Sequence, residues 1–482
     1  MLTILSNIMD AFGAAIVVPM MIFILALIMK VKPNKAMAAA INAGIGLTGF
    51  TMIIGAYSPI VTPVIQRMVD HTGVNLRVLD TGWQATAVVA YSTQVGMIFL
   101  GLGLALQTIL FLVRFTNVFM PSDLWNNYSF MLWGSMLFVA TGNLGLSIFL
   151  MVLSNLYCLV FTEIVAKRWS VYYGYPRCTM SAPHHITSVP LAILMDWILT
   201  KLGANKVQWN PEKIQEKLGF MGEPTSLGFV LGLLLGLAGN FMRLNELGAW
   251  GEIMIVGIAT SAIMAIFPKI AGIFASAFTT ITEASRNTAK KGGGKDRVWY
   301  LCINDAAGYG ETATLLTGML LIPIVLVAAI LLPGNQTLPM VDLIAIPYMI
   351  ELIIAISNGN IFKSIISGTI WCIGGLYIIT AVAPIFTEVA IEAGFHIPDG
   401  AMMIASFAVM TNHIMGILFL IFLTQNPIYI GATVVVYIAL YFFVRFKREA
   451  IHDYLERQAD LEAAAGRILA QANEPEFEIE PS

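Results

Sequence analysis

Residues 312–332 read TATLLTGMLLIPIVLVAAILL, an apolar stretch without a single charged side chain. A helix needs about 20 consecutive apolar residues to cross the roughly 30 Å of hydrocarbon in a bilayer. A helix that is apolar on every side is buried either in a large core or in a membrane. The segment therefore predicts a membrane-spanning helix, and similar runs recur along the chain.

The composition of the whole chain agrees with a membrane protein. Of its 482 residues, 58% are hydrophobic and 11% are charged, and the mean hydropathy is +0.79, whereas soluble domains carry about 25% charged residues. The net charge of -3 indicates neither an acidic nor a basic partner. The basic residues cluster beside apolar runs, where they signal topology rather than a nucleic-acid surface. Nucleic-acid binding is thereby excluded.

We predict an all-α polytopic membrane protein with about eleven transmembrane helices. The expected spans are Ala11–Met29, Met37–Tyr57, Val95–Val113, Met131–Leu153, Thr225–Met242, Ile253–Phe267, Thr312–Leu332, Ile344–Ile356, Ile365–Ala383, Met402–Leu423 and Ile428–Phe443. No repeat is visible among them.

The ends of the chain give the expected domains and sidedness. No Lys or Arg precedes the first apolar run, and Lys30, Lys32 and Lys35 follow it, so we expect the N-terminus outside. The cluster Arg445–Arg448 predicts a cytoplasmic C-terminus, yet Pro384–Gly400 lacks Lys and Arg and looks external. Either that loop is internal or one of the two runs between them does not cross. Residues 1–446 then form the membrane domain, and 447–482 form a cytoplasmic amphipathic helix and acidic tail.

Four segments depart from uninterrupted spans. Thr62–Asp80 carries charges among periodic apolar residues and predicts an interfacial amphipathic helix. Thr81–Gln94 is apolar but short, which predicts a re-entrant hairpin. The segment from Tyr172 to Lys201 mixes histidines, serines and prolines, and Cys302–Thr314 places acids beside glycines. Irregular backbone at membrane depth persists only around protein or a water-filled cavity, and carriers build their binding sites from such elements.

Strongly polar side chains inside hydrocarbon are functional candidates because burying them is costly. The candidates for substrate binding are Gln94, Asn143, His184, His185, Glu223 and Asp305, with Thr93 as a neighbour. We place Asp305 first, since a carboxylate accepts two hydroxyl hydrogen bonds at once.

Each candidate also has a purely structural interpretation. Gln94 and Asn143 would then bond a neighbouring helix, Glu223 would cap a helix, and Asp305 would pair with Arg297. The adjacent His184 and His185 point apart on a helix, so we expect no metal without a third ligand, and no cofactor.

Several motifs resemble one family in order along the chain. They are DTGW at Asp80–Trp83 closed by Thr93 and Gln94, GEPTSLGFVLG at Gly222–Gly232, PGNQTLP at Pro333–Pro339, and SNGNIFK at Ser357–Lys363 followed by Ser367 and Gly368. Together they resemble the galactitol-type membrane subunit, component IIC, of the bacterial sugar phosphotransferase system, as far as about Phe446.

The resemblance implies a permease in the bacterial inner membrane that carries galactitol or a related sugar or sugar alcohol. Soluble components A and B would phosphorylate that substrate through a phosphohistidine and a phosphocysteine, so this chain is not catalytic by itself. The resemblance also implies a homodimer in which a core with re-entrant hairpins slides against a dimerising scaffold as an elevator. The implied binding set is Gln94, Asn143, His184 and Asp305, with Thr93 and His185 as neighbours.

Two features keep the substrate and the mechanism open. The sequence has Pro183-His184-His185-Ile186-Thr187-Ser188 where the family suggests Pro-His-Gly-Thr-Ser, and Gly310-Glu311-Thr312 where it suggests Gly-His-Thr. These changes alter polar pocket residues, so another alditol or a hexose derivative remains an alternative substrate. The second function class is a proton-coupled secondary sugar transporter that uses Asp305, Glu311 or a histidine.

Overall fold

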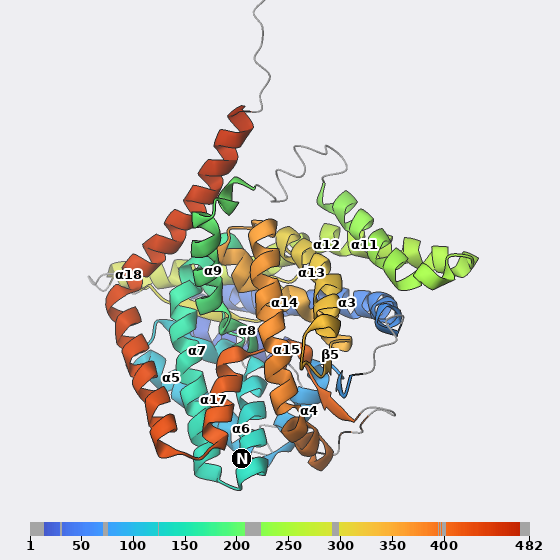
Figure 1. Ribbon diagram of the computed structural model, residues 1–482. Helices are drawn as coiled ribbons and strands as arrows, with labels where there is room; N and C mark the ends of the chain where they lie inside the picture. Colours follow the sequence, from blue (N-terminus) through green and yellow to red (C-terminus); the bar gives the residue numbers. More distant parts are fainter. Residues whose placement is uncertain are drawn as a thin grey trace, which may run out of the picture.

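The protein is a bundle of long helices interrupted by short helices and strands (Figure 1). The computed structural model describes residues 14–28, 31–70, 76–123, 125–207, 223–291, 298–393, 395, 397 and 402–472. Within these ranges, six helices contain a stretch that is long and apolar enough to cross a membrane. They are α5 (Gln94–Leu112), α7 (Leu144–Tyr172), α12 (Leu247–Lys291), α13 (Thr312–Leu331), α15 (Ile361–Glu392) and α18 (Pro427–Ala472). The expected helical membrane architecture is confirmed, and the total of about eleven crossings remains a prediction.

The other helices complete the bundle. They are α2 (Ala14–Ile28), α3 (Pro33–Asp70), α4 (Trp83–Ser92), α6 (Tyr128–Thr141), α8 (Pro183–Ile186), α9 (Val189–Lys201), α11 (Pro224–Asn240), α14 (Ile346–Ile356), α16 (Phe407–Met410) and α17 (His413–Leu423). Short 3₁₀ turns are η1 (Met120–Ser122), η2 (Trp125–Asn127), η3 (Ala204–Lys206), η5 (Phe241–Arg243), η6 (Asp305–Ala307) and η7 (Val341–Ala345).

Two of the expected spans are broken in the structure. Met131–Leu153 was expected as one helix, but α6 ends at Thr141 and α7 begins at Leu144 because Gly142 adopts φ 66°, a conformation that favours glycine. Met402–Leu423 divides into a strand, α16 and α17. With 11 residues, α17 rises about 16 Å, half of a bilayer core. Its shortness favours the interpretation that one apolar run before the C-terminal cluster does not cross.

Thr62–Asp80 does not form the separate helix expected there, and its position at a membrane interface remains a prediction. Residues 62–70 are the last turns of α3, and the segment ends in a strand, β1. Arg67 is half-buried and forms an ion pair with Glu252 of α12. One of the charges that suggested a membrane surface, that of Arg67, is therefore satisfied by a neighbouring helix, whereas Asp70 and Arg77 are exposed.

The all-α expectation needs one correction, because six short strands form two parallel three-stranded sheets. The first sheet has the order β5-β1-β6, with β1 (Val78–Asp80), β5 (Thr337–Leu338) and β6 (Met403–Ala405). The second has the order β2-β4-β3, with β2 (Val118–Phe119), β3 (Cys178–Met180) and β4 (Tyr300–Ile303). Each strand comes just before one of the helical breaks.

The two sheets reveal a repeat that no sequence pattern displayed. Strands β1, β2 and β3 precede β4, β5 and β6 in the chain, and each half contributes the central strand of one sheet and both edges of the other. Reciprocal pairing of this kind is the arrangement of two interlocked repeats about an approximate two-fold axis. The repeat extends to side chains: Ser406 donates to Asp342 at 2.6 Å in the first sheet, and Ser181 donates to Asp123 at 3.4 Å in the second.

Buried carboxylates hold the first sheet together. Asp80 accepts hydrogen bonds from the backbone N–H groups of Gly82, Met340, Asp342 and Phe407. The Asp342 carboxylate accepts from the N–H groups of Trp83 and Ala408. These bonds satisfy the first N–H groups of broken helices, which lack partners within the helix. The two carboxylates of the first sheet are thus engaged by backbone N–H groups around it.

Helix α18 crosses the expected domain boundary. It runs from Pro427 to Ala472 without a break at residue 446, along the outer side of the bundle at the left of Figure 1. The apolar span and the polar tail are therefore one continuous helix as far as Ala472. The acidic end of the tail lies outside the described residues.

Candidate functional site

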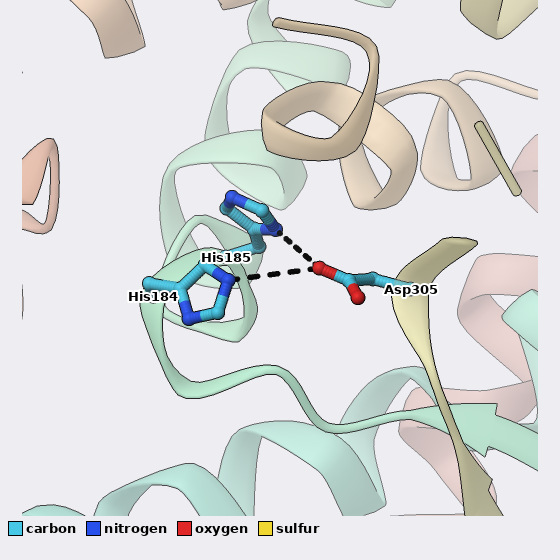
Figure 2. A group of neighbouring side chains, drawn as sticks. All are labelled: His184, His185 and Asp305. Carbon is cyan, nitrogen blue, oxygen red and sulfur yellow. Dashed lines mark ion pairs between the residues drawn. The ribbon is translucent and has the colours of Figure 1, made fainter. Parts of the chain in front are cut away.

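Three side chains that are distant in sequence meet at the second sheet (Figure 2). His184 and His185 lie on α8, which follows β3 after two residues, and Asp305 begins η6, which follows β4 after Asn304. Because β3 and β4 are adjacent parallel strands, their ends lie side by side. Pro183 favours the start of α8, since proline has no N–H to leave unpaired there.

The repeat fixes the position of α8. Asn412, the N-cap residue of α17, accepts a hydrogen bond from the Thr187 hydroxyl at 2.6 Å and donates to the Pro183 carbonyl at 2.9 Å. The turn after α8 thus binds the matching turn of the other half of the chain. One hydrogen bond on each side of the histidines, at Pro183 and at Thr187, holds them in place.

The three side chains converge on one carboxylate oxygen. His184 Nε2 lies 3.6 Å and His185 Nδ1 lies 3.4 Å from Asp305 Oδ2, as the dashed lines in Figure 2 mark. All three residues are buried. The imidazole rings meet at 73° with their centroids 4.1 Å apart. The adjacent histidines, expected to point apart, therefore both face Asp305.

A second layer of polar groups supports Asp305. Asn126 donates to Asp305 Oδ1 at 3.3 Å and to both oxygens of Asp123, at 3.1 and 3.0 Å. The ring of Tyr128, at the start of α6, lies 5.6 Å from that of His184. The site thus has carboxylate, amide and imidazole groups from three separate parts of the chain.

The imidazole groups have unused hydrogen-bonding capacity. Within the described residues, His184 Nδ1 and His185 Nε2 have no hydrogen-bond partner although they are buried, and His185 Nδ1 has only its 3.4 Å contact with Asp305. Buried polar atoms in folded proteins nearly always have partners. A polyhydroxylated ligand would supply them, because each hydroxyl both donates and accepts.

The donor set would also suit a metal ion. One ligand atom from each of His184, His185 and Asp305 lies within 4.8 Å of the others, so Asp305 is the third ligand that the sequence did not reveal. Two imidazoles and a carboxylate are donors that zinc accepts. The same three groups can bind sugar hydroxyls, and the two uses exclude each other.

The structure places Thr93 and Gln94 at a helix break. Thr93 separates α4 from α5, accepts from the Gly96 N–H and shares a hydrogen bond with Ser135 of α6. Gln94 begins α5 and its side chain is exposed. The expected short helix before a full span is present, and its re-entrant course remains a prediction.

Asn143 lies at the far end of α6 from the histidines. Tyr128, which touches His184, begins α6, and 14 residues of helix raise Asn143 about 20 Å along the axis. The Asn143 side chain is exposed and accepts from the Leu146 N–H as the N-cap of α7. In this conformation Asn143 does not contact the cluster.

The other two acidic candidates, Glu223 and Glu311, are both N-cap residues, but only Glu311 makes capping hydrogen bonds. Glu223 is the N-cap residue of α11, half-buried, and its side chain makes no capping bond. Glu311, an alternative proton carrier, accepts from Ala313 N–H and Thr314 N–H as the N-cap of α13. Arg297, the expected alternative partner of Asp305, lies outside the described residues.

Sequence reasoning missed three polar residues near the site. Asp123 and Asn126 lie in PSDLWNN, a polar stretch between two apolar runs that looked like an ordinary loop. Glu351 lies in α14, and its carboxylate packs against the backbone of Gly308, where an added Cβ would come within 2.4 Å of it. Glu351 lies within the expected span Ile344–Ile356, and a charged residue in an apolar run was a signal that could have identified it.

Comparison with known proteins identifies the family. A family model described as a PTS system sugar-specific permease component matches residues 7–401. The chain belongs to this family. The resemblance found in the sequence motifs is thereby confirmed, and with it an integral membrane permease of a sugar phosphotransferase system.

Curated relatives match over similar lengths. A putative permease IIC component of Escherichia coli strain K12 is 29% identical over 400 residues, which cover 83% of this chain and 90% of that protein. Two relatives carry the name PTS system galactitol-specific EIIC component, from Escherichia coli strains K12 and O157:H7. Each is 27% identical over 419 residues, which cover 86% of this chain and 90% of the relative.

Proposed function

We propose that this chain binds galactitol or a closely related sugar alcohol or sugar and translocates it while a soluble B component phosphorylates it. Membership of the permease family and the names of its relatives support this assignment. The observation that carries it is the buried group of His184, His185 and Asp305, in which His184 Nδ1 and His185 Nε2 have no partner among the described residues. Several closely placed polar groups match a ligand that presents hydroxyls on successive carbons.

The chemistry at the site is binding rather than catalysis. The Asp305 carboxylate accepts hydrogen bonds from hydroxyl groups, and each imidazole either donates or accepts according to its tautomer. Asn126 orients Asp305 from behind. Phosphate would come from a phosphocysteine on the B component, which itself receives it through component A.

We further propose that the protein works as a homodimeric elevator in the bacterial inner membrane. Helices α2, α3, α11 and α12 pack mainly on one another and would form the scaffold; α11 and parts of α3 and α12 lie at the right of Figure 1. The core would comprise both sheets and the helices that follow their strands. A groove of about 670 Å³ lined by α2, α3 and Ile270 includes Ala40 and Gly44, small residues that permit close helix contact. This groove would form the dimer contact.

The domain and membrane assignments follow the same proposal. Residues 1–446 would be the transport domain, with substrate-binding contributions from Gln94, Thr93, Asn143 and Glu223 in other steps of the cycle. Residues 447–482 would lie in the cytoplasm.

Uptake by membrane vesicles tests the function directly. Vesicles that contain this chain, components A and B and a phosphoenolpyruvate-driven supply of phosphate should accumulate only phosphorylated product from radiolabelled galactitol added outside, and an uncoupler should leave the rate unchanged. The matched control is a B component in which serine replaces the cysteine that carries the phosphate. With this variant, accumulation should stop. A panel of other alditols and hexoses would identify the preferred substrate.

One result would support the second function class instead. A proton-coupled carrier would concentrate unmodified substrate without component B and lose it when the proton gradient collapses. That outcome would overturn group translocation while leaving the family assignment intact.

A further inference from the structure

A basic pocket lies away from the histidine cluster, where α5, α7 and α18 meet. Its volume is about 310 Å³, and its lining includes Arg114, Arg445 and Arg448 together with Glu163 and Tyr441. Arg114 follows α5, and Glu163 lies on α7. Tyr441, Arg445 and Arg448 lie on α18, which packs against α7. Three guanidinium groups against one carboxylate give the pocket a positive charge.

The single carboxylate in the pocket is already engaged. Glu163 Oε1 accepts from the Thr116 hydroxyl at 2.7 Å and from the Asn117 N–H at 2.6 Å, and Glu163 Oε2 lies 4.0 Å from Arg448. Its role is to hold the loop 114–117 against α7. The positive charge of the other arginines is thus not neutralised by the carboxylate.

The arginines remain available to an outside anion. Within the described residues, the Arg114 side chain makes no hydrogen bond or ion pair, and the residue adopts φ 62°, which is unfavourable for a residue with a Cβ. Arg445 donates one hydrogen bond to the Tyr441 hydroxyl at 2.8 Å, and Tyr441 stacks on Phe115 at 4.3 Å. Arg114 and Arg445 are both exposed.

The pocket lies at the edge of the hydrocarbon layer. From Leu144 to Glu163 on α7, and from Pro427 to Arg445 on α18, the helix rises about 27–29 Å, close to the thickness of a bilayer core. The two helices begin at the same end of the bundle (Figure 1) and pack against each other. The arginines are therefore at the depth where lipid headgroups lie.

The surface beside the pocket is apolar and exposed. Leu112 and Val113 precede Arg114, and Phe443 and Phe446 flank Arg445, and all four are more than half exposed. A free phosphate would gain nothing from such a surface, which is typical of a membrane or protein contact. An acyl chain would cover it while its headgroup occupied the arginines.

We propose that this pocket binds the phosphate headgroup of an anionic phospholipid. Basic pockets between transmembrane helices on the cytoplasmic side are suited to such lipids, and the C-terminal cluster places this face in the cytoplasm. The loop that the lipid contacts also supports the histidine cluster: the Asn117 carbonyl accepts from the Tyr300 N–H at 2.8 Å, and β4 leads from Tyr300 to Asp305. The lipid would therefore stabilise the sheet that carries the substrate site.

Thermal unfolding of the purified full chain in detergent tests the proposal. Titration with phosphatidylglycerol should raise the Tm of the wild type, and phosphatidylcholine of the same chain length should not. The variant Arg445→Gln/Arg448→Gln should bind phosphatidylglycerol about 30-fold more weakly, since each basic side chain near an anionic surface contributes roughly a factor of five. Native mass spectrometry would count the lipids that remain bound.

A control of equal charge makes the result specific. Lys447→Gln/Arg457→Gln removes two exposed charges from the same helix outside the pocket and should retain lipid binding. Equal weakening in both double variants would overturn the pocket, as would equal stabilisation by phosphatidylcholine. Stabilisation by inorganic phosphate alone would assign the pocket to a free anion. If Arg445→Gln/Arg448→Gln bound lipid normally but no longer supported substrate phosphorylation by component B, the lipid proposal would fail and the pocket would be assigned to protein docking.

Discussion

Asp305 is the residue on which the proposed site depends, because both histidines and Asn126 approach its carboxylate. Sequence reasoning selected Asp305, His184 and His185 from the rarity of such groups in apolar surroundings. Their convergence could not be predicted, because 119 residues of chain and the pairing of β3 with β4 lie between them. Asp123 and Asn126 escaped notice for the same reason, since their role appears only when the strands pair.

Substitution of the cluster should weaken binding without unfolding the protein. Asp305→Asn keeps the size of the side chain but removes its charge, and His184→Ala removes one ring. Each should cost about 1–3 kcal/mol of substrate binding, the value of a hydrogen bond to a charged or polar partner. Equilibrium binding of radiolabelled galactitol to the purified protein would measure it.

The control for that experiment is Asp453→Asn, which removes an exposed carboxylate from α18. The affinity of Asp453→Asn for galactitol should equal that of the wild type. All three variants should elute alike in gel filtration. Wild-type affinity in both site variants would remove Asp305 and His184 from the binding site.

At the scale of elements, apolar run length predicted the long helices and failed at the breaks. The helix α13 begins at the expected Thr312 and ends at Leu331, one residue before the expected end. The strands were missed because two to four residues leave no alternating pattern to detect. The break at Gly142 was hidden because a left-handed glycine interrupts a helix without changing the hydropathy on either side.

A fully buried ion pair joins two of these elements. Lys363 of α15 donates to Asp196 of α9 at 3.1 Å and to the Thr200 hydroxyl at 2.7 Å. Lys363→Met should destabilise the protein by about 3–5 kcal/mol, because it leaves Asp196 buried without its cation. The Tm in detergent would report the loss.

Two further variants separate that charge effect from lost packing. Lys363→Met/Asp196→Leu should recover most of the Tm, since replacing both members of a buried pair by apolar residues is often neutral. Arg243→Met breaks more exposed contacts with Glu246 and Glu252 and should cost less than Lys363→Met. A double variant as unstable as the single one would show that Lys363 acts through packing.

At the scale of the whole molecule, the elevator requires the core to move against the scaffold. Tyr175, just before β3 in the core, lies with its ring 6.0 Å from that of Phe274 on scaffold helix α12. Contacts within the scaffold, such as Asn42 of α3 with Ser276 of α12 at 3.0 Å, should instead persist through the cycle. The two pairs therefore distinguish relative motion from a rigid molecule.

Cross-linking at these pairs should affect transport differently. A short bifunctional thiol reagent applied to Tyr175→Cys/Phe274→Cys should stop uptake by vesicles, reduction should restore it, and substrate binding should persist, because the link ties core to scaffold without touching His184 or Asp305. The same reagent on Asn42→Cys/Ser276→Cys should leave uptake unchanged. The native cysteines are all buried and should react little. Full uptake with the first pair completely cross-linked would mean that the core does not slide past α12, and the elevator proposal would fail.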